Sequence, residues 1–388
     1  MSGLTKPGGL LGLSLRAGAA VLALAFGSQF ASAEAQAAPG YSPGRTSWGV
    51  PDLQGTWSNA SITDLQRSPA YSNLVLTPEE AARIEGADYY NNRTREDAKP
   101  NDPTDTRLLD GTDLLSGGGY NAFWVDQGTK VGRVKGELRS SWIVEPANGR
   151  IPYKAGAGRG GEPAAAPAAQ PSSPVPRPSA SAPGKIAVQG PGAVDRNAGG
   201  GIGSYDNPET RPMGERCLIG FGNTGGPVMT NVLYNNTYQI VQAPEHVMIL
   251  VEMVHDARII PITRDRMRPD AIKPWLGDSI GWYEGDTLVV ETRNVHPLQR
   301  GYISASGVLT ERFTRWSKDH IVYAFTVDDP SLYSQPWKGE IGLNLSPEPL
   351  YEYACHEGNY AMEGILGGAR KQEREGKTVA ANADEEGR

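Results

Sequence analysis

Short alternations of apolar and polar residues, separated by tight-turn residues, fill the chain between Asn231 and Tyr360. Alternation bounded by Gly, Pro, Asn or Asp is typical of half-buried strands joined by turns. Consecutive antiparallel strands at this spacing form a meander that closes as a barrel or a sandwich. The predicted strands are 237–242, 247–262, two strands within 275–292 around a Glu-Gly-Asp turn, 311–316, 320–327, 337–345 and 350–355.

The most apolar stretch of the chain is Val247–Ile262, which only four charged or titratable residues interrupt. Its β-branched composition predicts one strand buried on both faces. Charges in such a strand are costly unless they are paired. The interrupting side chains therefore either satisfy one another as a structural network or line a cavity where chemistry happens: they are Glu252, His255, Asp256 and Arg258.

A first strand and a helix are predicted at the start of the domain, and residues 120–127 and 138–145 are predicted to form two further strands. Residues 51–57 are predicted to form the first strand, whose final tryptophan is expected to fill one end of the β core. Thr77 as N-cap, Pro78 at the first helical position and Glu80 as capping-box partner predict a helix. This helix is expected to run to about Asn91. The fold class is therefore mainly β with a short N-terminal helix.

Composition divides the chain into one β-rich domain, 51–370, and segments that lack the bulky apolar residues of a core. Residues 154–205 are largely Ala, Pro, Gly and Ser, which predicts a disordered low-complexity insertion within the domain. Residues 34–50 are expected to form an extended leader. The charged residues 371–388 are expected to form a disordered tail.

Residues 1–33 have the pattern of a cleavable signal peptide. Lys6 and Arg16 precede the apolar run Ala17–Phe26, and a small-residue cleavage site ends at Ala33. The run is too short to span a bilayer comfortably, so we expect a periplasmic or secreted protein without membrane insertion. The formal net charge of −7 argues against a nucleic-acid partner.

The chain has two cysteines, Cys217 and Cys355. In an oxidising compartment such a pair predicts one disulfide. Cys355 precedes His356 and Glu357, and a disulfide there would hold the imidazole rigidly, as suits a general acid or base. A histidine that only bonds a backbone carbonyl would fit the same position.

A second candidate group lies in the predicted strand 247–262. Strand geometry places Glu252, Asp256 and Arg258 on one face and His255 on the other. Arg258 is expected to pair with Glu252 or Asp256. These residues form either a buried ion-pair network or a catalytic or ligand-binding site.

Motifs for metals, nucleotides and activated nucleophiles are absent from the sequence. The five histidines form no H-E-x-x-H or H-x-H pattern, and no G-x-S-x-G or Walker motif occurs. We therefore expect no cofactor and no metal. A metal site assembled in three dimensions from His255, His356 and a carboxylate is the alternative.

The sequence also contains a series of short motifs: PDLQGTW at 51–57, NGRIP at 148–152, ERCL at 215–218, YNN at 234–236, HDARIIP at 255–261, GDS at 277–279, EGDTLVVET at 284–292 and YEYACHEGNY at 351–360. Together they resemble an uncharacterised family of exported bacterial β-rich proteins. The resemblance implies export and a shared fold, and it implies no reaction. Gly55-x-Trp57 resembles the first strand of lipocalins, so the barrel or sandwich is expected to be lipocalin-like.

Two functions follow from these residues. The first is an enzyme without cofactor, a lyase, hydratase or hydrolase, that acts on a small organic molecule with His, Asp and Glu as acid and base in a barrel pocket. The second is a lipocalin-like small-molecule binding or carrier protein without catalysis. Convergence of His255, His356 and a carboxylate in one open pocket would favour the enzyme.

Overall fold

The computed structural model describes residues 37–98, 125–155, 207–211, 213–220, 228–265, 268–297, 299 and 302–375. All of them belong to one compact unit, Ala35–Arg388. The predicted signal peptide 1–33 lies outside these residues, as does the predicted insertion from residue 156 to its end at 205.

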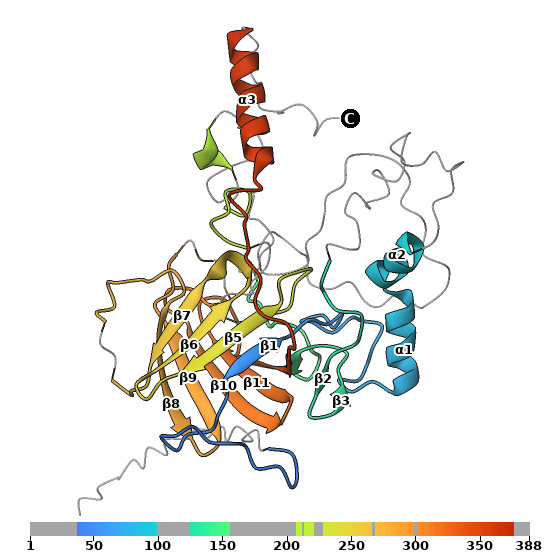
Figure 1. The fold of residues 1–388 in the computed structure, drawn as a ribbon, viewed down its shortest axis with the longest axis vertical. Coiled ribbons are helices and arrows are strands. Elements are labelled where there is room, and N and C mark those ends of the chain that lie inside the picture. Colours follow the sequence, from blue (N-terminus) through green and yellow to red (C-terminus); the bar gives the residue numbers. More distant parts are fainter. Residues whose placement is uncertain are drawn as a thin grey trace, which may run out of the picture. The chain divides into compact units, whose positions relative to one another are not determined.

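The protein is mainly β, as the alternation predicts. One antiparallel sheet wraps around a single core (Figure 1), with strands in the order β7-β6-β5-β1-β12-β11-β10-β9-β8 and β4 paired to β12 beside this path. Its strands are β1 (Gly55–Ser58), β4 (Ile143–Glu145), β5 (Thr237–Gln242), β6 (His246–Val251), β7 (Ala257–Pro261), β8 (Asp278–Glu284), β9 (Thr287–Arg293), β10 (Val308–Ser317), β11 (His320–Asp328) and β12 (Trp337–Leu345). The short strands β2 (Arg133–Val134) and β3 (Glu137–Leu138) form a separate hairpin.

The sheet nearly closes into a barrel between its two end strands, β7 and β8. Ile262, just after β7, makes a parallel bridge to Gly281 of β8, and the amide of Thr263 donates to the Gly281 carbonyl at 2.8 Å. A Cβ on Gly281 would lie 3.1 Å from Ile260 Cγ2, so glycine permits the close approach of β8 to β7. The barrel is thus closed by a short parallel junction rather than by a full ladder.

The two ends of the barrel differ in the length of their connections. At one end, β5–β6, β8–β9 and β10–β11 are joined by the tight turns 243–245, 285–286 and 318–319. At the other end, which we call the long-loop end, residues 294–307 join β9 to β10 and 329–336 join β11 to β12. Functional residues concentrate on longer loops that a rigid scaffold holds. We therefore expect a functional site at the long-loop end.

The predicted strand 247–262 is wrong as a single element, because it forms the hairpin β6–β7. Strand β6 ends at Val251, Glu252 has helical backbone angles, and a 3₁₀ turn covers Met253–His255. Strand β7 then starts at Ala257. Both strands of the hairpin are apolar and the turn contains no Gly or Pro. The sequence pattern therefore shows no break between the two strands.

Large side chains fill the interior of the barrel. Inward residues alternate along each strand, as in β10, where Leu309, Glu311 and Phe313 are fully buried. The largest fully buried side chains include five aromatic rings from β1, β5, β10, β11 and β12: Trp57, Tyr238, Phe313, Tyr323 and Trp337. The described interior is therefore a packed core.

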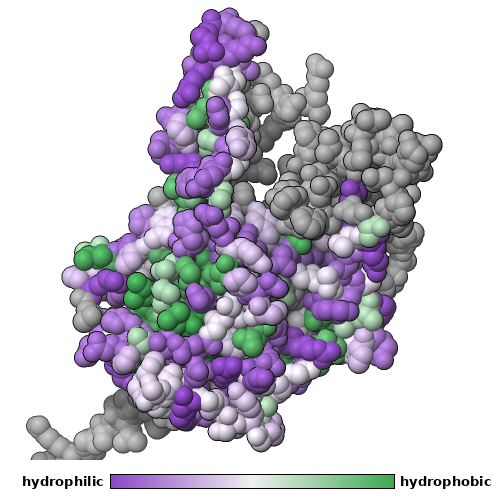
Figure 2. All heavy atoms as spheres, viewed as in Figure 1, coloured by the Kyte–Doolittle hydropathy of each residue, from purple (hydrophilic) through white to green (hydrophobic). Residues whose placement is uncertain are grey.

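The outer face of strands β5 to β7 carries an exposed apolar strip. Val241, Met248 and Ile259 are aligned by the strand register, and Ile259 is 63% exposed. Figure 2 shows hydrophobic residues gathered over this region. These strands therefore bury one face in the core, and part of the opposite face is exposed.

Two helices lie between strands β1 and β2 in the sequence. Helix α1 (Pro78–Ala87) starts with the predicted capping box, in which the Thr77 hydroxyl accepts from the Glu80 amide and the Glu80 carboxylate accepts from the Thr77 amide. It ends earlier than predicted, and α2 (Tyr89–Asp97) follows. None of the helices among the described residues is long and apolar enough to cross a bilayer.

The C-terminal part differs from the sequence prediction in two places. Residues 350–355 form no strand. Helix α3 (Tyr360–Arg374) extends into the predicted disordered tail, whose remaining residues from 376 lie outside the described chain. The Asn359 side chain accepts from the Met362 amide at 3.3 Å and so caps this helix.

Candidate functional site

The β6–β7 turn, residues 252–256, lies at the long-loop end and carries three of the predicted site residues. Backbone hydrogen bonds hold it to the sheet. The Val251 amide donates to the Asp256 carbonyl at 2.8 Å, and the Glu252 amide donates to the Thr237 carbonyl at 2.9 Å. The His255 amide donates to the Glu252 carbonyl at 3.3 Å within the turn. The turn is therefore an ordered extension of β6 and β7.

Two consecutive residues of this turn have left-handed backbone angles. The φ angles of Val254 and His255 are +61° and +47°. A left-handed conformation is uncommon for any residue with a Cβ and an outlier for a β-branched one. Such backbone strain persists only where the surrounding structure enforces it, and it clusters at functional sites. Here it buries Met253 and Val254 and leaves His255 exposed beside Asp256.

Asp256 is half-buried and carries the most perturbed carboxyl of the turn. Burial raises its pKa to about 6, and the neighbouring His255 offsets part of this effect. A carboxyl group with this pKa changes its charge close to neutral pH. It can therefore accept or donate a proton under physiological conditions, which an ordinary aspartate cannot do efficiently.

Glu252 is the buried member of the group, with 6% of its surface exposed. Its Oε2 atom accepts a hydrogen bond from the Thr237 amide at 3.2 Å, which ties the turn to the start of β5. Burial and the Glu252 charge together raise the pKa of Asp126. Two carboxyl groups, those of Asp256 and Asp126, thus have charged forms that are disfavoured.

Arg258 does not belong to this group, because its partner is Glu311 of β10. Its Nη1 atom donates to Glu311 Oε1 at 2.9 Å, and Nη2 forms a second bond to Oε2. Both side chains are almost fully buried. The predicted pairing of Arg258 with Glu252 or Asp256 is therefore wrong, since those carboxylates lie on the turn whereas Arg258 points into the barrel.

The Arg258–Glu311 pair is the centre of a buried polar network. The Tyr323 hydroxyl donates to Glu311 Oε1 at 2.8 Å and accepts from the Met229 amide at 3.2 Å. Arg258 also donates to the Thr292 hydroxyl at 3.2 Å. Burial alone would lower the pKa of Arg258, but Glu311 more than offsets this, so the guanidinium stays charged. The network supports the structural interpretation of Arg258.

Sequence reasoning missed Glu311, although a signal was present. In β10 it occupies the inward position between Leu309 and Phe313. The alternation of inward and outward side chains along a strand predicts an apolar residue there. A charge at such a position requires a buried partner. Strand periodicity indicates that residue 311 points inward. It does not identify Arg258, on a distant strand, as the partner of Glu311.

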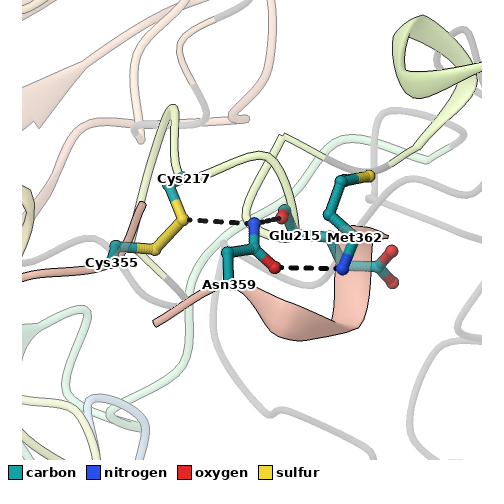
Figure 3. The surroundings of a disulfide bond; sticks show 5 residues. All are labelled: Glu215, Cys217, Cys355, Asn359 and Met362. Carbon is teal, nitrogen blue, oxygen red and sulfur yellow. Dashed lines mark hydrogen bonds between the residues drawn. A yellow bond between two sulfur atoms is a disulfide. The ribbon is translucent and has the colours of Figure 1, made fainter. Parts of the chain in front are cut away.

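The predicted disulfide between Cys217 and Cys355 is present (Figure 3). Asn359 reinforces the link, because its side-chain amide donates to the Glu215 carbonyl at 2.7 Å and to Cys217 Sγ at 3.5 Å. The residues around Cys217 are thereby fixed to the start of α3.

His356 follows this disulfide but is not joined to His255. Its exposed ring makes no hydrogen bond or ion pair with any residue the structure describes, and Glu357 is also exposed. The nearby Asn359 side chain is occupied by the helix cap and the Glu215 carbonyl. His356 instead lines a surface groove beside α3.

The expected convergence of His255, His356 and a carboxylate in one pocket is therefore absent among the described residues, and the predicted site residues fall into two groups. Glu252, His255 and Asp256 share the β6–β7 turn, and His356 lies beside the disulfide. Within the described ranges, no three His, Cys, Asp or Glu side chains are placed to hold one metal ion. Comparison with protein-family models, curated proteins and solved structures found no match, so the chain's own geometry is what identifies the β6–β7 turn as the candidate site.

Proposed function

We propose that this protein is an exported enzyme that transfers protons to or from a small organic molecule at the β6–β7 turn. The observation that carries the proposal is Asp256, whose pKa is raised to about 6 at the edge of a strained turn. A perturbed carboxyl beside an exposed histidine is a combination that acid–base sites use. The disulfide supports export, because such bonds persist in oxidising compartments.

Three residues of the turn have distinct roles in this proposal. Asp256 is the proton-transfer group, and exposed His255 binds or protonates the substrate from the adjacent position. Glu252 is a positioning residue, since its carboxylate bonds the Thr237 amide and fixes the turn. The reaction class is a lyase, hydratase or hydrolase reaction, in which one proton transfer accompanies bond cleavage or addition of water.

A carrier that holds its ligand inside the barrel is the weaker alternative. Tyr238, Phe313, Tyr323 and Trp337 occupy the described interior and are fully buried there. A ligand in that space would require several of these rings to move. The end of the barrel, where Asp256 and His255 lie, needs no such displacement.

We expect Asp256→Asn to abolish at least about 99% of turnover, because loss of a general acid or base costs about a hundredfold or more in rate. Untargeted metabolite profiling of cell extract incubated with the purified protein would identify the depleted compounds. Their depletion rates would then be compared between the wild type, Asp256→Asn and His255→Ala.

Two matched variants control this experiment. Asp319→Asn makes the same change at an exposed turn of the opposite end, and His246→Ala removes an exposed histidine at the far end of the same hairpin. Both should retain wild-type rates, and so should His356→Ala. Full turnover by Asp256→Asn, or loss of turnover with His356→Ala alone, would refute this assignment.

A further inference from the structure

A groove outside the proposed site lies between helix α3 and the segment that contains Cys217. Its apolar part is formed by Pro208, Leu218, Met362 and Leu366, and its volume is about 480 Å³. This is within the range of about 300–1,000 Å³ that small-molecule sites occupy.

The groove is held in shape by covalent and polar links. The disulfide joins Cys217 to Cys355, and Asn359 binds the Glu215 carbonyl at one wall while capping α3 at the other (Figure 3). Leu218 is 44% exposed although the turn that carries it is fixed, with its amide bonded to the Met213 carbonyl at 2.9 Å. An apolar side chain presented on a rigid wall is preorganised to bind an apolar group.

Three titratable residues line the groove: Arg216, His356 and Glu363 of the first turn of α3. The one ion pair of Arg216 among the described residues joins Nη2 to Glu209 at 2.9 Å, and Glu209 is 74% exposed. An exposed pair of this kind contributes at most about 1 kcal/mol. The guanidinium therefore keeps donors for a carboxylate, which it can bind in a bidentate manner.

We propose that this groove binds small amphipathic monocarboxylates. The apolar chain or ring of the ligand packs against Leu218, Met362 and Leu366, and its carboxylate binds Arg216 with His356 beside it. The binding site is independent of the β6–β7 turn. It gives His356 a role in ligand recognition rather than in proton transfer.

Isothermal titration calorimetry of the full chain with octanoate tests this proposal. The wild type should bind octanoate saturably, and Arg216→Gln should weaken binding about tenfold or more, the loss expected for a charge-assisted hydrogen bond. Neutral octanamide should bind the wild type and Arg216→Gln equally. Glu209→Gln should tighten octanoate binding up to about fivefold, because it removes the competing carboxylate.

Two further variants complete the design. Leu218→Ser should weaken octanoate and octanamide alike, and Arg293→Gln, which removes an exposed arginine paired with Glu291, should change neither. No saturable binding of octanoate to the wild type would overturn the proposal. Equal octanoate affinity of the wild type and Arg216→Gln would overturn it as well.

Discussion

Replacing Glu311 with glutamine is expected to lower the free energy of unfolding by about 3–5 kcal/mol, the usual cost of breaking a buried ion pair. The substitution leaves the Arg258 guanidinium charged and almost fully buried without its counter-ion. It also removes the carboxylate that accepts a hydrogen bond from the Tyr323 hydroxyl. Strands β7, β10 and β11 meet at this network, so its loss weakens the barrel as a whole.

Urea unfolding followed by circular dichroism measures this effect. Glu291→Gln is the matched control, because Glu291 lies on the neighbouring strand β9 in an exposed ion pair with Arg293. The control should cost less than about 1 kcal/mol. The double variant Arg258→Met/Glu311→Leu should recover much of the stability, since it removes both buried charges. A loss below 1 kcal/mol for Glu311→Gln would contradict a structural role for the pair.

Removing the disulfide is expected to have an effect of similar size. Cys217 precedes β5 and Cys355 follows β12, so the bond encloses a loop with a sequence separation of 138 that contains most of the barrel. In the chain-entropy model a cross-link of this length stabilises the folded state by about 5 kcal/mol. The double variant Cys217→Ser/Cys355→Ser should lose up to about that amount.

The comparison uses the oxidised wild type, the reduced wild type and the double variant in the same urea titration. Reduced wild type and double variant should unfold at the same lowered midpoint, and reductant should leave the double variant unchanged. An unaltered midpoint would mean that the region around Cys355 unfolds independently of the barrel.

Local sequence patterns predicted the strands whose boundaries depend on alternation and turn residues. Residues 237–242 and 337–345 form β5 and β12 with the expected bounds, and the Glu-Gly-Asp turn joins β8 to β9. The helix cap at Thr77 is also present. These features depend on neighbouring residues in the chain, which is why sequence alone reveals them.

Features that depend on distant contacts were not predictable. The chain reverses direction at Val254 and His255 with left-handed backbone angles. Gly and Asn, which usually adopt such angles in turns, are absent from this turn. The pairing of β1 with both β5 and β12 joins segments far apart in sequence. Helix α3 contains Gly364, Gly367 and Gly368, which weaken its helix signal, whereas the Asn359 cap and the adjacent disulfide favour it.

The candidate site was predicted in part. The sequence identified Glu252, His255 and Asp256 by their charge within an apolar run, and the structure places them together on one turn. Strand geometry had separated His255 from Asp256, because the turn between β6 and β7 was not recognised. The raised pKa of Asp256 arises from burial in the fold, so composition could not reveal it.

The most direct test of the account is the pKa of Asp256, measured by following its side-chain carboxyl carbon in a ¹³C NMR pH titration and assigning the signal by its loss in Asp256→Asn. Proton transfer at the β6–β7 turn requires a midpoint near the value of about 6 that burial produces. An ordinary aspartate titrates at about 4, and the exposed carboxyl of Asp319 is followed in the same titration as the internal reference. A midpoint for Asp256 that coincides with that of Asp319 would contradict the account.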